Sequence, residues 1–369
     1  MTLLSNFLRF SLIYVAIPFV IAVLAVPLLK RIGLKLDIYA HENNRTVHHG
    51  KIVRIGGAAI YLAFIISMTL IMETDPTINS ILIGGSIIFF VGLIDDIVDL
   101  PAIVKLAGQV IAAIIVIQIG GIHLGDLHLP FGIVIETGII SKVITFFWII
   151  GITNAINLID GLDGLSSGIS IIVLFTIAFL GFHMKSYAVV MMAMILMGGT
   201  LGFWFYNFHP ASIFMGDCGA LYLGFNIACF SLMGFKTATF ITLALPIVIL
   251  FVPILDTLVA IVRRKLRGES FSTADREHLH HILMYKLKLG HKKSVITLYI
   301  VTFLFAMTAI ISYFYEDYGM ILLLILIIGF ELFIELTDMI NSKYHPLLGL
   351  SRRLFGFPKK KEKKEDENE

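Results

Sequence analysis

Four polar stretches of this chain carry residue types that can do chemistry, and the first is rich in carboxylates. It spans Val91–Pro101 and holds Asp95, Asp96 and Asp99. If the helix that carries them continues beyond the apolar run before it, Asp95 and Asp99 share one face. Three carboxylates this close repel each other, so we expect a cation to offset them, either Mg²⁺ or Lys105. The alternative interpretation is a solvated helix end.

The second stretch repeats polar side chains at every third position. It spans residues 154–168, and the repeated positions are Asn154, Asn157, Asp160 and Asp163. This spacing places amides and acids on one face of a helix end, and the glycines that follow allow the backbone to come close to a ligand. An apolar helix gains nothing from such a stripe unless the stripe binds polar groups. The alternative is a helix–turn–helix connection with glycine caps.

The third stretch has a single acid between two glycines, just before an apolar run. Asp217 lies between Gly216 and Gly219. The glycines suit the close approach of a metal–phosphate complex, and a carboxylate is an oxygen ligand of the kind that Mg²⁺ prefers. Without a ligand, an acid at this position would be the N-cap of the following helix.

The fourth stretch joins a basic run to a group of histidines. Arg276, His278, His280 and His281 follow the basic residues of 263–267. Arginine together with neutral or protonated histidine forms a set of side chains that binds anions such as phosphate. The histidines could instead be structural, or bind zinc. Because no cysteine is near and carboxylates are frequent elsewhere, we expect Mg²⁺ rather than zinc.

Together, the four stretches predict a site for a diphosphate held by a metal ion. Carboxylates would hold the metal, the metal would bridge phosphate oxygens, and basic residues would neutralise the remaining charge. A further basic segment, which includes Lys51 and Arg54, could assist. The chain has no Walker A sequence, and this excludes a P-loop ATPase. No feature points to nucleic acid.

The elements that must position these stretches are membrane helices. Of the 369 residues, 58% are apolar and 15% are charged, whereas soluble domains carry about 25% charged residues. This composition excludes a soluble globular enzyme, a disordered chain and a disulfide scaffold. About eleven apolar runs, several of them short, are interpreted as spans, and they lack the alternation of membrane strands. The predicted fold is therefore an all-α polytopic membrane protein in the lipid bilayer. The runs are Phe10–Leu29, Ile55–Met72, Ile81–Ile94, Ile103–Ile119, Val143–Ile159, Leu165–Phe182, Tyr187–Phe205, Ala220–Gly234, Ala238–Val262, Ser294–Tyr313 and Gly319–Met339.

The distribution of basic residues predicts the orientation of the chain. With the N-terminus outside, all but four of the 28 lysines and arginines fall on one side, which the positive-inside rule makes cytoplasmic. We expect residues 1–340 to form one multi-pass domain of the cell membrane and residues 341–369 a charged cytoplasmic tail. The four polar stretches then lie at the cytoplasmic face. The outside connection 120–142 is rich in turn residues and predicts a small hairpin.

The sequence resembles the polyprenyl-phosphate N-acetylhexosamine-1-phosphate transferases over roughly residues 10–340. Four motifs match in the family's order: Leu93–Asp99, Asn154–Gly164, Phe214–Asp217 and His278–His281. Within the superfamily, phospho-N-acetylmuramoyl-pentapeptide transferases typically show three consecutive histidines and tend to have Lys at the position of Asp99. The pattern here is similar to the bacterial undecaprenyl-phosphate N-acetylglucosamine-1-phosphate transferases.

The resemblance implies transfer of N-acetylglucosamine-1-phosphate from UDP-GlcNAc to undecaprenyl phosphate with release of UMP. This is the first membrane step of a cell-envelope glycan such as teichoic acid or O-antigen. The alternatives are the phospho-MurNAc-pentapeptide transferase reaction of peptidoglycan synthesis, an ion-coupled secondary transporter and a scaffold for other glycan enzymes. A transporter would place its acids near the bilayer midplane, whereas here the acids lie at the ends of the runs. A homodimer is expected by family analogy only.

The resemblance also implies roles for individual residues. Asp217, with Asp160, is expected to hold Mg²⁺, or Mn²⁺. Asp95 is expected to contact or deprotonate the lipid phosphate, with support from Asp96. The remaining expected contacts to substrate are Asn157 and Asp160 at the diphosphate, Asp163 at the nucleotide end, Arg276, His278, His280 and His281 at the donor phosphate or acetamido sugar, and Asp99, Lys105 and Lys51 near the phosphates.

Overall fold

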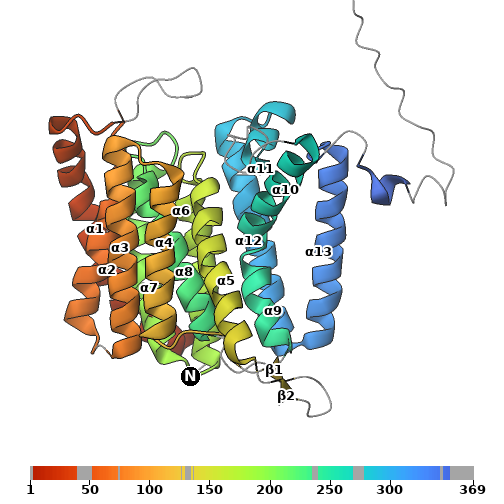
Figure 1. Ribbon diagram of the computed structural model, residues 1–369, viewed down its shortest axis with the longest axis horizontal. Helices are drawn as coiled ribbons and strands as arrows, with labels where there is room; N and C mark the ends of the chain where they lie inside the picture. The colour runs from red at the N-terminus through yellow and green to blue at the C-terminus, as the bar shows by residue number, and fades with distance from the viewer. Residues whose placement is uncertain are drawn as a thin grey trace, which may run out of the picture.

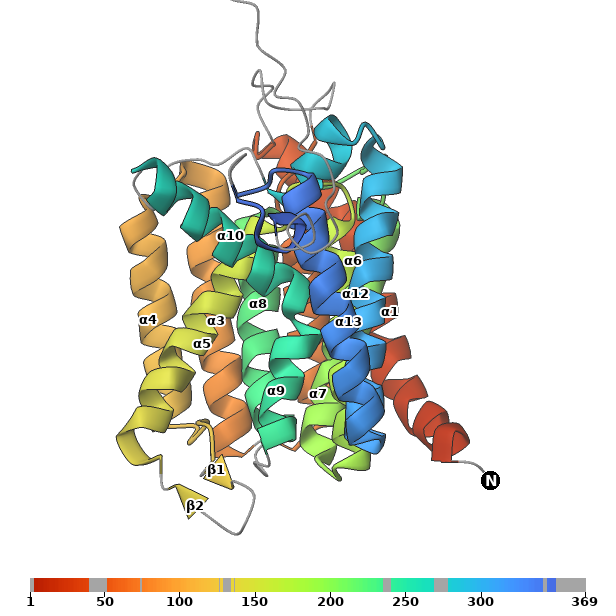
Figure 2. The ribbon, with the colours of Figure 1, turned by 90° about the vertical axis from the view of Figure 1, so that its right-hand side faces the viewer.

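The computed structural model is a bundle of long helices that run side by side (Figure 1, Figure 2). It describes residues 3–39, 52–73, 75–125, 127–128, 134–135, 137–234, 240–268, 278–340 and 344–349. Two of the expected site residues, Lys51 and Arg276, lie outside the described residues, as does most of the predicted tail 341–369.

The described part of the chain is almost entirely helical, as predicted. A short antiparallel hairpin interrupts the helices, with Leu127 of β1 (Leu127–His128) opposite Ile135 of β2 (Val134–Ile135). It confirms the hairpin expected within 120–142. The helices are α1 (Leu3–Lys35), α2 (Gly57–Ile71), α3 (Pro76–Val98), α4 (Ala102–Gln118), α5 (Gly138–Leu158), α6 (Leu165–His183), α7 (Tyr187–Asn207), α8 (Gly216–Gly234), α9 (Phe240–Ile249), α10 (Phe251–Arg267), α11 (Leu279–His281), the π-helical turn η2 (Ile282–Lys286), α12 (His291–Phe314) and α13 (Glu316–Leu336).

Eight of the described helices are long and apolar enough to cross a bilayer, and α2 and α4 are shorter apolar helices. The ninth predicted run, Ala238–Val262, is divided between α9 and α10. Pro253 explains the division, because proline has no N–H to donate to Ile249 and its ring clashes with that carbonyl group. The apolar helices describe a multi-pass membrane protein, while the count of eleven spans and the orientation stay predictions.

Helix α8 lies at the centre of the bundle, packed against α2, α3, α5, α6 and α7. Glycines allow two of these contacts to be very close. A Cβ atom on Gly92 of α3 would lie 2.6 Å from the Cα of Cys218, and one on Gly57 of α2 would lie 2.2 Å from the Cα of Gly219. Small residues let helix backbones approach in this way. The end of α3 and the start of α8 are therefore held together, and both carry acids.

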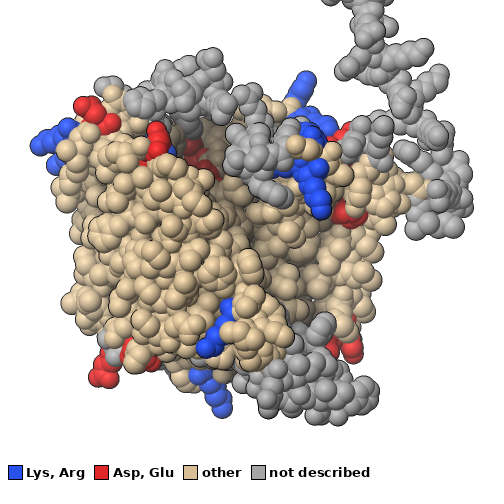
Figure 3. All heavy atoms as spheres, viewed as in Figure 1, with Lys and Arg blue, Asp and Glu red and all other residues tan. Residues whose placement is uncertain are grey.

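The charged side chains gather at the two ends of the bundle, and the broad face between them is formed mostly by other residues (Figure 3). The polar stretches at the end of α3, between α5 and α6, at the start of α8 and around α11 all lie at one end (Figure 1). Helix α1 begins at the opposite end, where the N-terminus is marked (Figure 1). The bundle thus places the predicted site residues on one side.

Candidate functional site

Asp96 fixes the start of α8 and with it Asp217. Its Oδ1 accepts the N–H of Asp217 at 2.9 Å, and its Oδ2 accepts the N–H of Cys218 at 3.0 Å. The first N–H groups of a helix lack partners within the helix, and a carboxylate is favoured there by the helix dipole. Gly216 precedes them with φ = 73°, and a Cβ on it would lie 2.4 Å from Asp96 Oδ2. Asp96 is therefore a cap supplied by a neighbouring helix.

Lys105 of α4 links two carboxylates. Its Nζ lies 3.2 Å from Asp95 Oδ2 and 2.9 Å from Asp217 Oδ2. The other oxygen of Asp95 accepts the N–H of Leu100 at 2.8 Å. This geometry confirms the expectation that Lys105 offsets the acidic cluster. It also brings Asp217 to the Asp95–Lys105 pair, although Asp217 lies 112 positions from Lys105 in the sequence.

Asp99 lies apart from this cluster. Helix α3 ends at Val98, and Asp99 has a left-handed backbone with φ = 51°. Its side chain is 89% exposed and lies 3.8 Å from Arg54 Nη1. The prediction that Asp95 and Asp99 share a helix face is wrong, because the helix ends before Asp99. Arg54 also lies 3.6 Å from Asp96 Oδ1 and so faces the acidic cluster.

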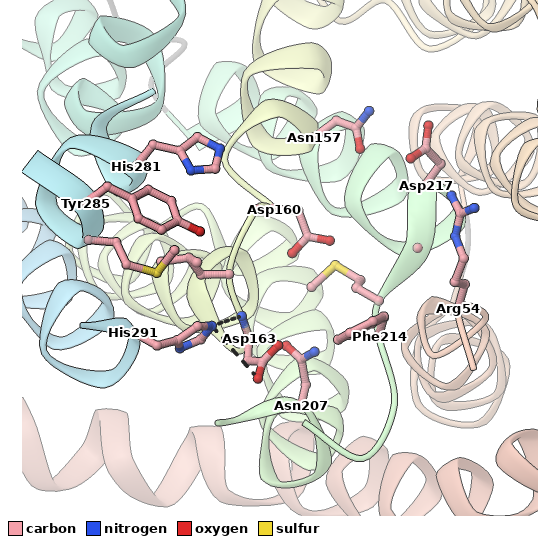
Figure 4. A pocket seen from close by; sticks show the side chains of 15 residues that line it. Arg54, Asn157, Asp160, Asp163, Asn207, Phe214, Asp217, His281, Tyr285 and His291 are labelled. Atoms are coloured by element: carbon pink, nitrogen blue, oxygen red, sulfur yellow. Dashed lines mark hydrogen bonds and ion pairs between the residues drawn. The ribbon is translucent and has the colours of Figure 1, made fainter. Parts of the chain in front are cut away.

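A polar cavity of about 320 Å³ opens beside Asp217. Figure 4 shows Asp160 between Asp217 and Arg54 on one side and His281 and Tyr285 on the other. Of the expected site residues, the cavity lining includes Asn157, Asp160, Asp163, Asp217 and His281. Those outside the lining are Asp95, Asp96, Asp99, Lys105, His278 and His280.

Asp160 is the titratable group at the middle of the cavity. Burial raises the pKa of its carboxyl to about 8, and the negative charges of Asp217, Asp96 and Asp163 add to the shift. A carboxyl that is held protonated by burial and by neighbouring acids is ionised when a cation binds beside it. Asp160, Asp217 and the amide oxygen of Asn157 provide oxygen donors in one cavity, the ligand type that suits Mg²⁺.

The connection between α5 and α6 forms one wall of the cavity and is tied to the connection between α7 and α8. Asp163 Oδ2 accepts the N–H of Ala211 at 3.1 Å and lies 2.8 Å from His209 Nδ1. Asn207 Oδ1 accepts the N–H of Gly164 at 3.1 Å. These bonds hold Asp163 as part of the wall.

Among the described residues, one group of three potential metal ligands has its ligand atoms within 4.8 Å of one another. Its members are Asp163, His209 and His291. The Asp163 N–H, however, donates to His291 Nε2 at 3.2 Å, so this lone pair already has a partner. This hydrogen bond joins the α5–α6 connection to the start of α12. The histidines at 278–281 are not among the groups of potential metal ligands found in the described residues.

The histidines of the fourth stretch occupy different environments. His278 Nδ1 lies 2.9 Å from Asp256 Oδ2. His280 is buried, and its pKa is lowered to about 3, chiefly by that burial, so that it is neutral. His281 lines the cavity, and its ring stacks near Tyr285 with centroids 5.8 Å apart. The stretch is thus anchored at one end and reaches the cavity at the other.

Asn154 of the second stretch has a structural partner instead of a place in the cavity. Its Nδ2 donates to Gln109 Oε1 at 2.6 Å, and Gln109 Nε2 donates back at 3.2 Å. This reciprocal pair joins α4 to α5. Because α5 ends at Leu158, the three-residue period does not continue as one helical face to Asp163.

Sequence reasoning missed several residues of the site. Asp256 had a signal, because an acid inside an apolar run is costly unless it has a partner. Asn207 and His209 had a weaker signal, as polar residues shortly before Asp217. Nothing in the sequence singled out Tyr285 or His291.

Comparison with known proteins gives consistent matches. A family model described as glycosyl transferase family 4 matches residues 78–235. The chain is 37% identical, over 93% of its length and 98% of the other protein's, to a probable undecaprenyl-phosphate N-acetylglucosaminyl 1-phosphate transferase of Bacillus subtilis (strain 168). It is 32% identical to a decaprenyl-phosphate N-acetylglucosaminephosphotransferase of Mycobacterium leprae (strain TN), over 72% of this chain and 74% of that one. A phospho-N-acetylmuramoyl-pentapeptide-transferase of Lactobacillus helveticus (strain DPC 4571) is 34% identical over 48% of this chain and 60% of its own.

Proposed function

Because this chain belongs to the polyprenyl-phosphate N-acetylhexosamine-1-phosphate transferases of glycosyl transferase family 4, we propose that it transfers N-acetylglucosamine-1-phosphate from UDP-GlcNAc to undecaprenyl phosphate. The products would be UMP and GlcNAc-diphospho-undecaprenol. The similarity to the Bacillus subtilis protein, which extends over nearly all of both chains, supports this donor and acceptor. The lipid product would start a cell-envelope glycan such as teichoic acid or O-antigen.

The observation that carries the proposal is the cavity lined by Asp160, Asp217 and Arg54, with Lys105 bound to Asp217 from outside the lining. A sugar nucleotide brings a diphosphate, so carboxylates can face it only if a cation lies between them. The oxygen donors Asp160, Asp217 and Asn157 fit Mg²⁺, and Mn²⁺ accepts the same ligand type. When bound, the metal would neutralise charge on the phosphate oxygens.

The chain's own side chains would then position two anions for reaction. A phosphate monoester is ionised near pH 7, since its second pKa is about 6, and the attacking oxygen of the lipid phosphate needs little proton abstraction. Positioning and charge neutralisation should therefore provide most of the rate enhancement. We assign Lys105 and Arg54 to the phosphates, and Asp95 to the lipid phosphate through its contact with Lys105. Asp96 supports Asp217 through the α8 cap.

The two ends of the cavity suit the two ends of the donor. Asp163, held by hydrogen bonds in the cavity wall, is assigned to the nucleotide end. His281 and Tyr285, which lie across Asp160 from Asp217 and Arg54 (Figure 4), are assigned to the sugar. Nucleotide sugars are soluble compounds of the cell interior. Most of the lysines and arginines are predicted to lie on the side of the membrane that carries the four polar stretches, so we place the site at the cytoplasmic face.

The experiment is an assay of UMP release by the purified protein in lipid. It uses undecaprenyl phosphate with either UDP-GlcNAc or UDP-MurNAc-pentapeptide, with Mg²⁺ and with EDTA. We expect UMP from UDP-GlcNAc only, and only with Mg²⁺. Release from the MurNAc donor alone would favour the alternative suggested by the Lactobacillus relative. A folded protein that releases no UMP from either donor would refute the transferase proposal.

A further inference from the structure

A buried acid of α10 holds the start of the histidine segment. Asp256 is 2% exposed, and both of its oxygens have partners. Its Oδ2 lies 2.9 Å from His278 Nδ1, and its Oδ1 accepts the N–H of Leu279 at 2.8 Å. A carboxylate that is buried among apolar side chains is costly unless it is paired. Both oxygens of Asp256 therefore bind the residues at the start of α11.

Helix α10 is a fixed support for this contact. Arg263, two turns beyond Asp256, is fully buried, and its Nη1 donates to the carbonyl oxygen of Met339 at 2.8 Å. The α10 backbone is thereby joined to the segment that follows α13. Asp256 therefore acts from a helix that is itself anchored.

The contact continues from Asp256 to the cavity through stacked rings. The rings of His278 and His280 are parallel, with centroids 5.9 Å apart. His280 then packs on Gly161, where a Cβ would lie only 2.2 Å from its Nε2. Gly161 follows Asp160 in the cavity wall, and His281 lines the same cavity. A shift of His278 would therefore move both sides of the space between Asp160 and His281.

We propose that Asp256 is a positioning residue that sets the His278–His281 segment against the Asp160 wall and so determines how tightly the sugar nucleotide binds. The proposal rests on the proposed function, since it assigns the cavity to the donor. Asp256 accepts from His278 Nδ1, which fixes the tautomer and the ring orientation. It touches no substrate, and its effect is confined to the donor because the acceptor groups Asp95 and Lys105 lie on α3 and α4.

The test is a set of substitutions with separate KM values for donor and acceptor. Asp256→Asn keeps the shape and an oxygen for the Leu279 N–H, but its amide cannot accept from a protonated Nδ1. We expect the KM for UDP-GlcNAc to rise about tenfold, or about 1.4 kcal/mol. The KM for undecaprenyl phosphate should not change, and the Tm should move by no more than about 2 °C. Combining it with His278→Asn should raise the donor KM no further than His278→Asn alone, because both act through one contact.

Two controls and a second variant make the result decisive. Asp75→Asn makes the same substitution at an exposed N-cap at the other end of the bundle, where Asp75 Oδ1 accepts the N–H of Ile78 at 2.8 Å, and should leave both KM values unchanged. Gly161→Ala presses on His280 from the cavity side and should reproduce the donor-specific rise even if Asp256→Asn does not fold. Gly151→Ala, where a Cβ meets nothing within 4 Å, is its control.

Failure of this inference is distinct from failure of the proposed function. A wild-type protein that releases no UMP refutes the function. An active wild type whose Asp256→Asn and Gly161→Ala variants keep the donor KM, or raise both KM values equally, overturns the positioning role. Equilibrium binding of UDP-GlcNAc to the same variants, measured by calorimetry without the acceptor, should weaken by the same factor as the donor KM.

Discussion

At the scale of single residues, the site holds more acidic than basic side chains, and Lys105 offsets the negative charge of two of the acids. Its ammonium group lies against both Asp95 and Asp217. A cation that binds at Asp217 must share this carboxylate with Lys105 or displace it. The lysine is thus expected to weaken metal binding while it assists turnover, and these two effects are separable by substitution.

Lys105→Met tests this competition. Removal of the ammonium group leaves two carboxylates without their cation, so we expect Mn²⁺, used as a probe for Mg²⁺, to bind about tenfold more tightly. Turnover should fall at least tenfold, because a phosphate-neutralising group is lost. Mn²⁺ affinity can be followed by electron paramagnetic resonance. Weaker Mn²⁺ binding in the variant would contradict the competition.

The raised pKa of Asp160 gives a pH dependence to cation binding. With a pKa of about 8, the carboxyl is mostly protonated at pH 7, and a cation must displace the proton. Metal affinity should therefore rise about tenfold per pH unit up to about pH 8 and then level off. By the same linkage, the metal-free protein should lose stability as the pH rises from about 4 to about 8, because the folded state binds this proton more tightly than the unfolded chain.

Calorimetric titration with Mg²⁺ between pH 6 and pH 9 measures this effect. The Asp160→Asn variant has no proton to displace, so its weaker metal affinity should vary much less with pH. An equal pH dependence in the variant and the wild type would show that another group is responsible.

At the scale of elements, the site depends on how closely α3 and α8 approach. The glycine at position 92 allows the α8 backbone to pass where a methyl group would otherwise lie. That contact places the Asp96 carboxylate on the first N–H groups of α8. The helix packing and the position of Asp217 are therefore parts of one arrangement.

Gly92→Ala tests this arrangement. A Cβ at 2.6 Å from the Cα of Cys218 forces the helices apart, and overpacking of this kind costs about 1–3 kcal/mol. We expect a lower unfolding temperature in detergent and a larger loss of UMP release than the Tm alone explains, because Asp96 no longer reaches the α8 cap. Gly151→Ala, with open space around it, should be neutral. A Gly92→Ala protein with normal activity would show that the close approach is dispensable.

The elements themselves were largely predictable, because apolar runs of this length have few alternatives to membrane helices. The division of the ninth run was not predicted, although the sequence carries its signal, because Pro253 lies inside the run and a proline there ends or kinks a helix. The positions of Asn154 and Asp99 relative to the site also escaped prediction. The position of Asp99 depends on where α3 ends, and boundaries are the least certain part of a sequence-based prediction. The position of Asn154 depends on its pairing with Gln109 of α4.

The acids of the site were predictable, whereas the histidine that pairs with one of them was not. Charges are expensive in an apolar chain, so Asp160 and Asp217 stood out, and the cavity contains both. His291 did not stand out, because its partner Asp163 is 128 positions away and a histidine near a helix start has many uses. Long-range pairing of this kind becomes visible only in the folded chain.

At the scale of the whole molecule, the bundle separates two ends that the membrane would keep in different compartments. Helix α13 begins at the end opposite to α11 (Figure 1). The positive-inside rule assigns the α11 end to the cytoplasm, which is also where soluble sugar nucleotides are to be bound. The orientation is therefore a prediction with a functional consequence.

Cysteine labelling tests this orientation. Both native cysteines are buried, so the background should be low. Asp317→Cys, in the first turn of α13, should react with a membrane-impermeant maleimide on intact cells. Lys286→Cys, with a half-exposed side chain next to α11, should react only after permeabilisation. The reverse pattern would place the site outside and contradict the proposed topology.

We propose that one cavity at the membrane surface moves a phosphosugar from a nucleotide to a lipid, and the fate of the donor's β-phosphate distinguishes this transfer from every other reaction of the two substrates. Purified protein is given UDP-GlcNAc labelled with ³²P at the β-phosphate, together with undecaprenyl phosphate and Mg²⁺. We predict label in the lipid fraction, an equal amount of unlabelled UMP, and neither product with Asp217→Asn. Label that stays with the nucleotide while sugar enters the lipid, or no lipid product from a folded wild-type protein, would rule out phosphosugar transfer.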